Sequence, residues 1–203
     1  ILKGADLTDA ILTNADLTDA ILTNADLSDA ILQFASLRNA NLEGANLRNA
    51  DLSNTHFDNA NLSNAILENA VIVDIDLDNA NLRNADLSNT LFIGTALKVW
   101  REEVKIDFWA IEKFCHVPDS GAYNDQHNME NTVFIGADFS NSVVTSVDFF
   151  GNDLTGTIFK GADLSNSDLT DVTLVDANLS AANLKNADLR NANLTNAILT
   201  GAD

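Results

Sequence analysis

The sequence predicts an all-β solenoid, in which the chain winds into a coil and each turn of the coil pairs with the next. Three observations predict this fold: a large apolar residue at every fifth position, a small residue two positions before it, and turn-forming residues between. With Leu7 taken as a centre, twenty centres run from position 2 to position 97; seventeen are Leu, and the others are Phe57, Ile72 and Phe92. A step of five residues would spread these side chains around every face of an α-helix, so a helix is excluded.

Each five-residue unit contains a short extended stretch followed by a turn. Ala occupies 15 of the 19 positions that lie two residues before a centre between 5 and 95. Two inward residues separated by one outward residue is the alternation of extended chain. The remaining positions are mostly Asp, Asn, Ser, Thr and Gly, which suit turns. A chain that turns after every five residues and keeps one side inward must wind into a tube.

The repeated phrase, with its pattern A(D/N)LXX, resembles the pentapeptide repeat family over residues 1–97 and 131–203. The resemblance implies a right-handed quadrilateral β-helix with four quintets in each coil, Leu and Ala inside, and no enzymatic site. Residues 1–97 then form about five coils, and residues 131–203 form about three and a half. We expect the structural core to include Leu7, Leu12, Leu17, Leu22, Leu47, Phe57, Phe139, Phe159, Leu164 and Leu189.

Residues twenty apart stack on such a coil, which predicts ladders of asparagine. The ladders are Asn41/Asn61/Asn81 before the centres, and Asn39/Asn59/Asn79 and Asn49/Asn69/Asn89 after them. Stacked amides can hydrogen-bond from coil to coil. The alternative interpretation is that asparagine only suits the turn.

Residues 98–130 interrupt the repeat and differ from it in composition. Both Trp residues, the single Tyr, Pro and Cys, and two of the three His lie there. Trp100, Val104, Phe108, Ile111 and Cys115 have helical spacing, which predicts a helix from about 97 to 114 followed by a loop. An alternation from Val104 to Ala110 favours a strand instead. The insert is therefore predicted to be partly helical.

The repeat resumes with a centre at Phe134, 37 residues after Leu97, so its five-residue phase is lost. The only methionine, Met129, stands just before the second block. The two blocks are short and Leu-centred, like cyanobacterial members of the family. We therefore hypothesise that two small cyanobacterial pentapeptide repeat proteins have been joined.

The titratable residues do not form a recognisable catalytic or metal-binding motif. Cys115, His116, Asp125 and His127 match no zinc spacing, and a Cys–His nucleophile is equally unsupported. His56 falls at an outward position of a repeat and is predicted to be a surface residue. We therefore predict no catalytic residue, no cofactor and no metal ligand.

The composition is strongly acidic, with a net charge of −19. This charge argues against direct binding to nucleic acid or to an anionic membrane, and favours a partner with a basic surface. No apolar run approaches the ~18 residues of a membrane span. A single cysteine permits no internal disulfide, so we expect a cytoplasmic protein. Because the chain does not begin with Met, a removed targeting peptide is the alternative.

The leading functional prediction is a non-enzymatic structural scaffold, an acidic rod that binds an unidentified protein partner. The family resemblance offers an alternative, because some members mimic DNA and bind DNA gyrase, a type II topoisomerase. The predicted charge density supports that alternative, with about one charge per 2.6 Å of rod against ~1.7 Å for duplex DNA. A third and weaker interpretation is a sugar-cleaving β-helix enzyme. Uncapped coil ends also predict weak end-to-end self-association.

The N-terminal stretch adds a ten-residue repeat to the five-residue one, and this repeat defines a candidate partner surface. Quintets ten residues apart lie on opposite sides of a four-sided coil. Acidic residues then load one pair of opposite sides: Asp6, Asp9, Asp26 and Asp29 on one, Asp16 and Asp19 on the other. The other pair carries outward isoleucines, with Ile1 and Ile21 facing away from Ile11 and Ile31. These apolar strips are the candidate contacts for a protein partner.

Overall fold

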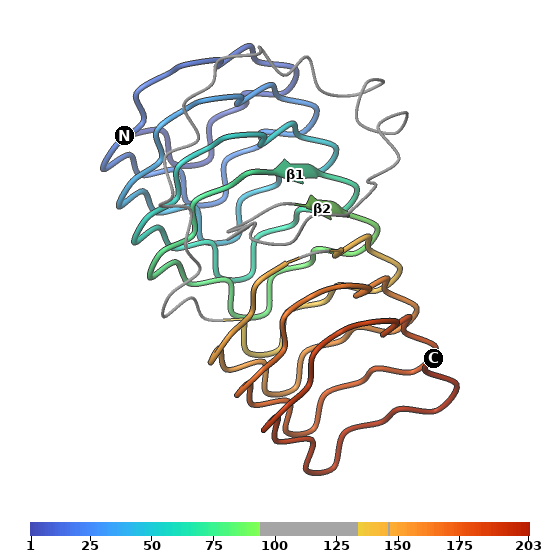
Figure 1. The fold of residues 1–203 in the computed structure, drawn as a ribbon. Coiled ribbons are helices and arrows are strands. Elements are labelled where there is room, and N and C mark those ends of the chain that lie inside the picture. The colour runs from blue at the N-terminus through green and yellow to red at the C-terminus, as the bar shows by residue number, and fades with distance from the viewer. Residues whose placement is uncertain (94–133, 146) are drawn as a thin grey trace, which may run out of the picture.

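The computed structural model describes residues 1–93, 134–145 and 147–203. These residues wind into a stack of similar coils, with the two chain ends at opposite ends of the stack (Figure 1). The predicted insert at 98–130 and its helix at 97–114 lie outside the described residues. The division into two repeat blocks therefore stays a prediction. Within the described ranges, no helix is long and apolar enough to cross a membrane.

Each coil takes twenty residues and has four sides. Successive parallel bridges join Asp6 to Asp26, Ile11 to Ile31, and Asp16 to Ser36, so each residue pairs with the one twenty positions on. The bridges fall at every fifth residue, which gives four rows along the tube. Two three-residue strands, β1 (Val71–Val73) and β2 (Leu91–Ile93), pair in parallel with the same register. Extended segments this short are what a turn in every quintet allows.

The corner between sides is a four-residue turn with one left-handed residue. At the corner formed by residues 7–10, the Ala10 N–H donates to the Leu7 carbonyl at 3.1 Å, and Asp9 has φ 57°. A positive φ at the third residue of a turn favours Gly, Asn and, less strongly, Asp. This preference explains why those residues recur two positions after each centre. Phe34 and Ala181 occupy this position with φ of 59° and 56°.

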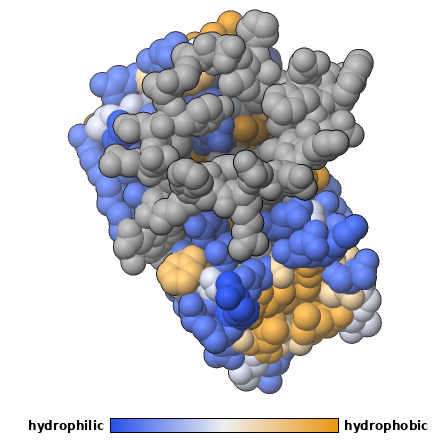
Figure 2. All heavy atoms as spheres, viewed as in Figure 1, coloured by the Kyte–Doolittle hydropathy of each residue, from blue (hydrophilic) through white to orange (hydrophobic). Residues whose placement is uncertain are grey.

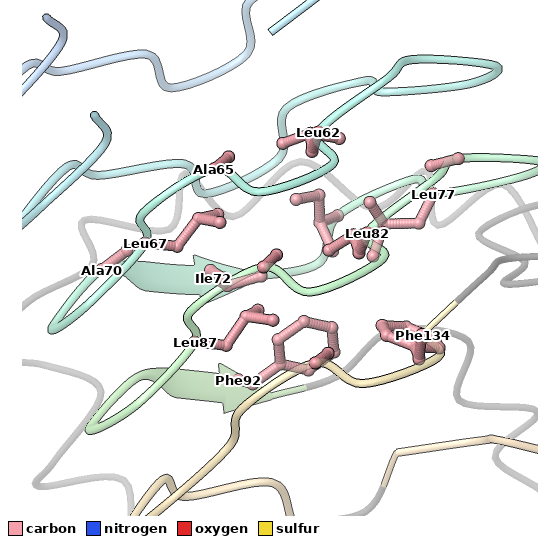
Figure 3. Packing of buried hydrophobic residues seen from close by; sticks show 14 of the residues in the cluster. Leu62, Ala65, Leu67, Ala70, Ile72, Leu77, Leu82, Leu87, Phe92 and Phe134 are labelled. Carbon is pink, nitrogen blue, oxygen red and sulfur yellow. The ribbon is translucent and has the colours of Figure 1, made fainter. Parts of the chain in front are cut away.

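The tube interior is filled by the centres and by the small residues before them. Figure 3 shows Leu67, Ile72 and Leu87 pointing into this interior from successive sides and coils. Six of the ten predicted core residues are fully buried: Leu22, Leu47, Phe57, Phe139, Phe159 and Leu164. The other four are only partly buried and pack against the core from the end coils: Leu7, Leu12, Leu17 and Leu189. On the face in view, Figure 2 shows hydrophobic residues at the surface of the C-terminal coils.

The predicted amide ladder at positions 41, 61 and 81 is confirmed. Asn61 donates its side-chain amide to Asn41 at 3.3 Å, and Asn81 donates to Asn61 at 3.0 Å. Asn69 bonds Asn49 in the same way at 3.3 Å. The turn interpretation also holds, because the ladder at 49 and 69 uses residues with positive φ. Asparagine therefore serves both the turn and the contact between coils.

The coils continue across the break in the repeat, although the five-residue phase of the sequence does not. Asp86 pairs in parallel with Asp138, and Leu91 pairs with Val143. The separation is 52 positions, the same as that between Thr90 and Ser142, which hydrogen-bond at 3.0 Å. Because one coil takes 20 positions, the stack resumes on the same side after 32 additional residues. The length of the connection therefore breaks the five-residue spacing of the sequence, whereas the stacking of one coil on the next is preserved.

Aromatic side chains concentrate where the coils resume. Phe92 meets Phe139 edge-on at 5.8 Å, and Phe139 stacks on Phe159 at 5.0 Å with an interplanar angle of 15°. Phe134 and Phe149 also meet edge-on, at 5.6 Å. Such pairs add about 0.5–1.5 kcal/mol each to the free energy of burial. They join the coils before and after the break into one hydrophobic core.

Candidate functional site

The isoleucines of the predicted partner surface lie in two of the four rows of outward residues. Ile11 bridges Ile31 in one row, and Ile21 bridges Asn41 in another. The exposed fractions fall from 98% for Ile1 and 78% for Ile11 to 40% for Ile21 and 38% for Ile31. The two isoleucine rows are therefore distinct and solvent-accessible, and whether they contact a partner stays a prediction.

The predicted acidic residues fall into two structural classes. Asp6 bridges Asp26, whereas Asp16 is followed in its row by Ser36. The second class stands at the left-handed turn position: Asp9, Asp19 and Asp29 have φ of 57°, 60° and 59°. Two of these accept a side-chain amide from the next coil, Asp19 from Asn39 at 3.1 Å and Asp29 from Asn49 at 2.9 Å.

Carboxylates in the bridge rows also fold back onto their own turn. Asp16 accepts the Thr18 backbone N–H at 3.1 Å, and Asp26 accepts that of Ser28 at 3.0 Å. Hydrogen bonds to a carboxylate favour its charged form. The side chains of Thr18 and Ser28, together with these N–H groups, therefore lower the pKa of Asp16 and of Asp26. Aspartate before a centre is thus a turn residue as well as a charge.

Isoleucine in the same position gives up that hydrogen bond. Asn41 and Asn61 accept the N–H of Glu43 and of Ser63, at 3.1 and 3.2 Å. The side chain of Ile31 has no acceptor for the equivalent N–H. The exposed isoleucines therefore replace a turn-stabilising group with an apolar one.

Phe34 is a second departure from the repeat, and the sequence analysis did not select it. It stands at the turn position that Asn, Asp or Gly occupies in most quintets, with φ 59° and a residue exposure of 43%. A left-handed conformation costs an ordinary residue about 1–2 kcal/mol. Phe34 lies three residues after Ile31, on the adjoining corner. The sequence contains a signal for it, because Phe34 interrupts the series of Asn, Asp and Gly residues found two positions after the centres.

A polar cluster on a third row was also missed. His56, Asp58 and Asp76 each offer a potential ligand atom, and these atoms all lie within 4.8 Å of one another. His56 was predicted to be a surface residue; its side chain is only 33% exposed, and its Nδ1 lies 3.8 Å from Asp76 Oδ2. The twenty-residue stacking rule would have paired positions 56 and 76. Cys115, His116, Asp125 and His127 lie outside the described residues.

The sequence matches the family model for pentapeptide repeats in eight copies, over residues 1–33, 35–72, 72–98, 134–171, 148–183 and 173–203. No match was found among curated proteins. One similar solved structure is HetL, a pentapeptide repeat protein involved in heterocyst differentiation regulation in the cyanobacterium Nostoc. It is 25% identical, with 99% of this chain and 81% of that chain covered and a TM-score of 0.46.

Two further solved structures resemble the chain. One is a pentapeptide repeat protein of the Arabidopsis thaliana thylakoid lumen, at 21% identity, with 63% of this chain and 66% of that chain covered and a TM-score of 0.46. The other is QnrB1, a plasmid-mediated fluoroquinolone resistance protein, at 20% identity, with coverage of 93% and 82% and a TM-score of 0.47.

The family model covers most of the chain on both sides of the break, and its matches follow the five-residue pattern seen in the coils. Membership implies a right-handed quadrilateral β-helix, which agrees with the four bridge rows and the twenty-residue coil. On these grounds the chain belongs to the pentapeptide repeat family.

Proposed function

We propose that this protein is a non-enzymatic scaffold that binds a protein partner through the surface formed by Ile11, Ile31 and Phe34. The observation that carries the proposal is their exposure: Ile11 and Ile31 pair in one row with exposed fractions of 78% and 38%, and Phe34, in the same quintet as Ile31, is 43% exposed. Contiguous exposed apolar side chains rimmed by polar ones are typical of protein interaction sites.

Two departures from the local rules of the fold coincide at this surface. Ile31 lacks the side-chain oxygen with which Asp or Asn before a centre accepts a backbone N–H. Phe34 has a left-handed backbone conformation that is unfavourable for a residue with a bulky side chain. Natural sequences tend to break local rules at functional sites. The coincidence of both departures in one quintet supports a role in binding rather than in folding.

The remainder of the surface indicates the chemistry of the partner. The net charge is −19 and the sequence isoelectric point is about 4.1. Figure 2 shows mostly hydrophilic flanks on the face in view. A strongly acidic protein attracts cations, and its charge steers association with a basic surface. The partner we propose therefore presents an apolar contact within a basic surface.

The non-enzymatic part of the proposal rests on how the described carboxylates are used. In the bridge rows they accept backbone N–H groups of their own turns, as Asp138 does from Ser140 at 2.8 Å and Asp168 from Thr170 at 2.9 Å. This arrangement repeats along flat sides of the tube. Repetition of one structural hydrogen bond is what a scaffold requires, whereas catalysis requires unlike groups with different roles.

The test is affinity capture from a cyanobacterial lysate with three immobilised proteins: the native chain, the double variant Ile11→Asn/Ile31→Asn, and the control Ile66→Asn. Asn at these positions restores a turn acceptor, as Asn41 shows, so the fold is retained. Ile66 occupies the same quintet position in another row. We expect a basic protein that the native chain and the control retain and the double variant loses. Equal retention by all three would refute the proposal.

A DNA mimic directed at DNA gyrase is the second candidate function, and one row of carboxylates favours it. Asp148 bridges Asp168, which bridges Asp188, so one side carries acid in three successive coils. Parallel coils lie about 4.8 Å apart. A supercoiling assay with purified gyrase separates the two candidates, because a mimic inhibits or protects the enzyme at micromolar concentration and the scaffold proposed above has no effect.

A further inference from the structure

The cluster of His56, Asp58 and Asp76 brings three potential metal ligands together from two coils. His56 and Asp76 are partners in a parallel bridge, so their side chains leave the same side of the tube one coil apart. Asp58 follows His56 by two positions, in the adjoining turn. One ligand atom from each residue lies within 4.8 Å of the other two.

The carboxylate of Asp76 is buried and already oriented. Its side chain is 10% exposed, and its Oδ1 accepts the Asp78 backbone N–H at 3.2 Å. The other oxygen, Oδ2, is 3.8 Å from Nδ1 of His56. Burial favours the neutral form of Asp76, but interactions with His56, the Asp78 N–H and Asp58 outweigh it and lower the pKa of Asp76. The buried carboxylate is thus held in place beside the imidazole before any ion binds.

From this geometry we propose that His56, Asp58 and Asp76 bind one divalent transition-metal ion of the zinc type. One imidazole nitrogen with two carboxylate oxygens is a ligand set that Zn²⁺ accepts, with water in the fourth position. Ca²⁺ and Mg²⁺ prefer oxygen ligands, so the imidazole nitrogen favours a transition-metal ion over either of them. The ion links the third coil to the fourth.

The distances allow such an ion after a small rearrangement. Metal–ligand bonds of ~2.0–2.1 Å in a tetrahedron place ligand atoms about 3.4 Å apart. The distance between His56 Nδ1 and Asp76 Oδ2 exceeds this by about 0.4 Å. The side chains of His56 and Asp58 are 33% and 23% exposed, so rotation about their side-chain bonds can close the difference.

One neighbouring cation opposes metal binding and provides a directional test. The Arg38 Nε donates to Asp58 Oδ2 at 3.1 Å. Its positive charge reduces the attraction of the site for a second cation. Removing this charge should therefore strengthen metal binding, whereas removing a ligand should weaken it. A merely structural hydrogen-bonded cluster predicts neither effect.

The experiment is calorimetric titration of the full chain with Zn²⁺ alone, after chelator treatment and removal of the chelator. The background carries His116→Gln and His127→Gln, so that His56 is the remaining histidine. We expect one ion per chain. His56→Gln and Asp76→Asn should each weaken binding about tenfold or more, because loss even of a supporting group costs 10–100-fold.

Two further variants complete the design. Arg38→Gln should tighten binding several-fold, and Asp26→Asn, a carboxylate before a centre in another row, should leave it unchanged. Heteronuclear NMR of the imidazole nitrogens in the unsubstituted chain gives a readout that needs no variant, because Zn²⁺ should shift Nδ1 of His56. The proposal would be overturned if the background chain showed no Zn²⁺ affinity, or if His56→Gln and Asp76→Asn bound Zn²⁺ as tightly as that background chain does.

Discussion

Deleting 32 residues from the connection between the described ranges should leave one uninterrupted β-helix. Residues 82 and 134 are both centres, and Asn84 donates its N–H to the Ile135 carbonyl at 3.1 Å across the break. The separation of 52 positions is one coil of 20 plus 32 others. Removing residues 100–131 places Thr132 two positions before the next centre, a site where Thr55 and Thr90 already occur. The variant also carries Val99→Asn, because position 99 then becomes a left-handed turn residue.

The expected change in stability follows from loop entropy. The connection between residues 93 and 134 shortens from 40 residues to 8. Chain-closure entropy scales as (3/2)RT ln n, so bringing residues 93 and 134 together costs about 1.4 kcal/mol less across the shorter connection. The buried contacts at the seam, including Phe92 with Phe139, are retained. We therefore expect a chain as stable as the parent or more stable by about 1–2 kcal/mol.

The matched control removes residues 100–130, one residue fewer. The extra residue must then form a bulge or turn Phe134 from the inner to the outer side. Burial of a Phe side chain contributes about 1.5–3 kcal/mol, so the control should be less stable by roughly that amount. Urea unfolding followed by circular dichroism measures both. If the two deletions unfold at the same midpoint, or the first loses cooperativity, the inferred register is wrong.

Two further substitutions test the turn geometry and the cluster at Asp76. Gly44→Ala should destabilise the fold more than Gly156→Ala does. Both glycines have similar positive φ, but an added Cβ at Gly44 would press on the Asn24 side chain, which must then move, whereas the space at Gly156 is open. Thermal unfolding of both variants measures the difference, and equal losses would show that only φ matters. Asp76→Asn should destabilise the metal-free chain at neutral pH and narrow its deficit as the pH falls below about 4, because the folded pKa of Asp76 lies below its unfolded value and the contribution is lost as the carboxyl protonates. Urea unfolding at pH 7 and pH 3 measures this, and a constant deficit would contradict it.

The regular part of the molecule could be predicted from the sequence because one local rule repeats. A five-residue pattern with Leu inside fixes the twenty-residue stacking once four sides are assumed, and the bridges of Asp6 with Asp26 and of Ile11 with Ile31 follow. The side on which the coil resumes could not be predicted. Quintets on the four sides are chemically similar, so Phe134 could have followed any of them; hydrogen bonds and aromatic contacts at the seam select one.

The candidate sites were harder to predict, because they are departures from the repeat rather than consequences of it. Phe34 stands out in the sequence only as an exception at a turn position, whereas the isoleucines recur in a pattern that predicts an apolar surface. The cluster at His56 requires two spacings together, twenty residues to Asp76 and two to Asp58. Only the twenty-residue spacing follows from the stacking of coils. The turn after His56 sets the direction of the Asp58 side chain and so brings it near His56 and Asp76.

Aspartate is common in the bridge rows, but its frequency alone says little about function. The positions where aspartate stands instead of asparagine are more informative. Either residue can accept the N–H two positions on, as Asp168 does from Thr170 and Asn61 does from Ser63. Asparagine adds an amide that bonds the next coil, as at 41, 61 and 81. Aspartate in successive coils instead places like charges about 5 Å apart, which costs about 0.8 kcal/mol per pair even in water.

Aspartates that stack in consecutive coils do not stabilise the fold better than asparagines would. Attraction to a cation outside the protein therefore explains them better. The row of Asp148, Asp168 and Asp188 is such a case. Arg190, two positions after Asp188, pairs with that carboxylate at 2.6 Å, so an external cation would act mainly on Asp148 and Asp168. Asparagine at these positions would preserve the turns and relieve the repulsion. The row thus favours a basic partner surface along the C-terminal coils, which the second candidate function also requires. Replacing Asp with Asn in this row should weaken binding to such a partner without weakening the fold.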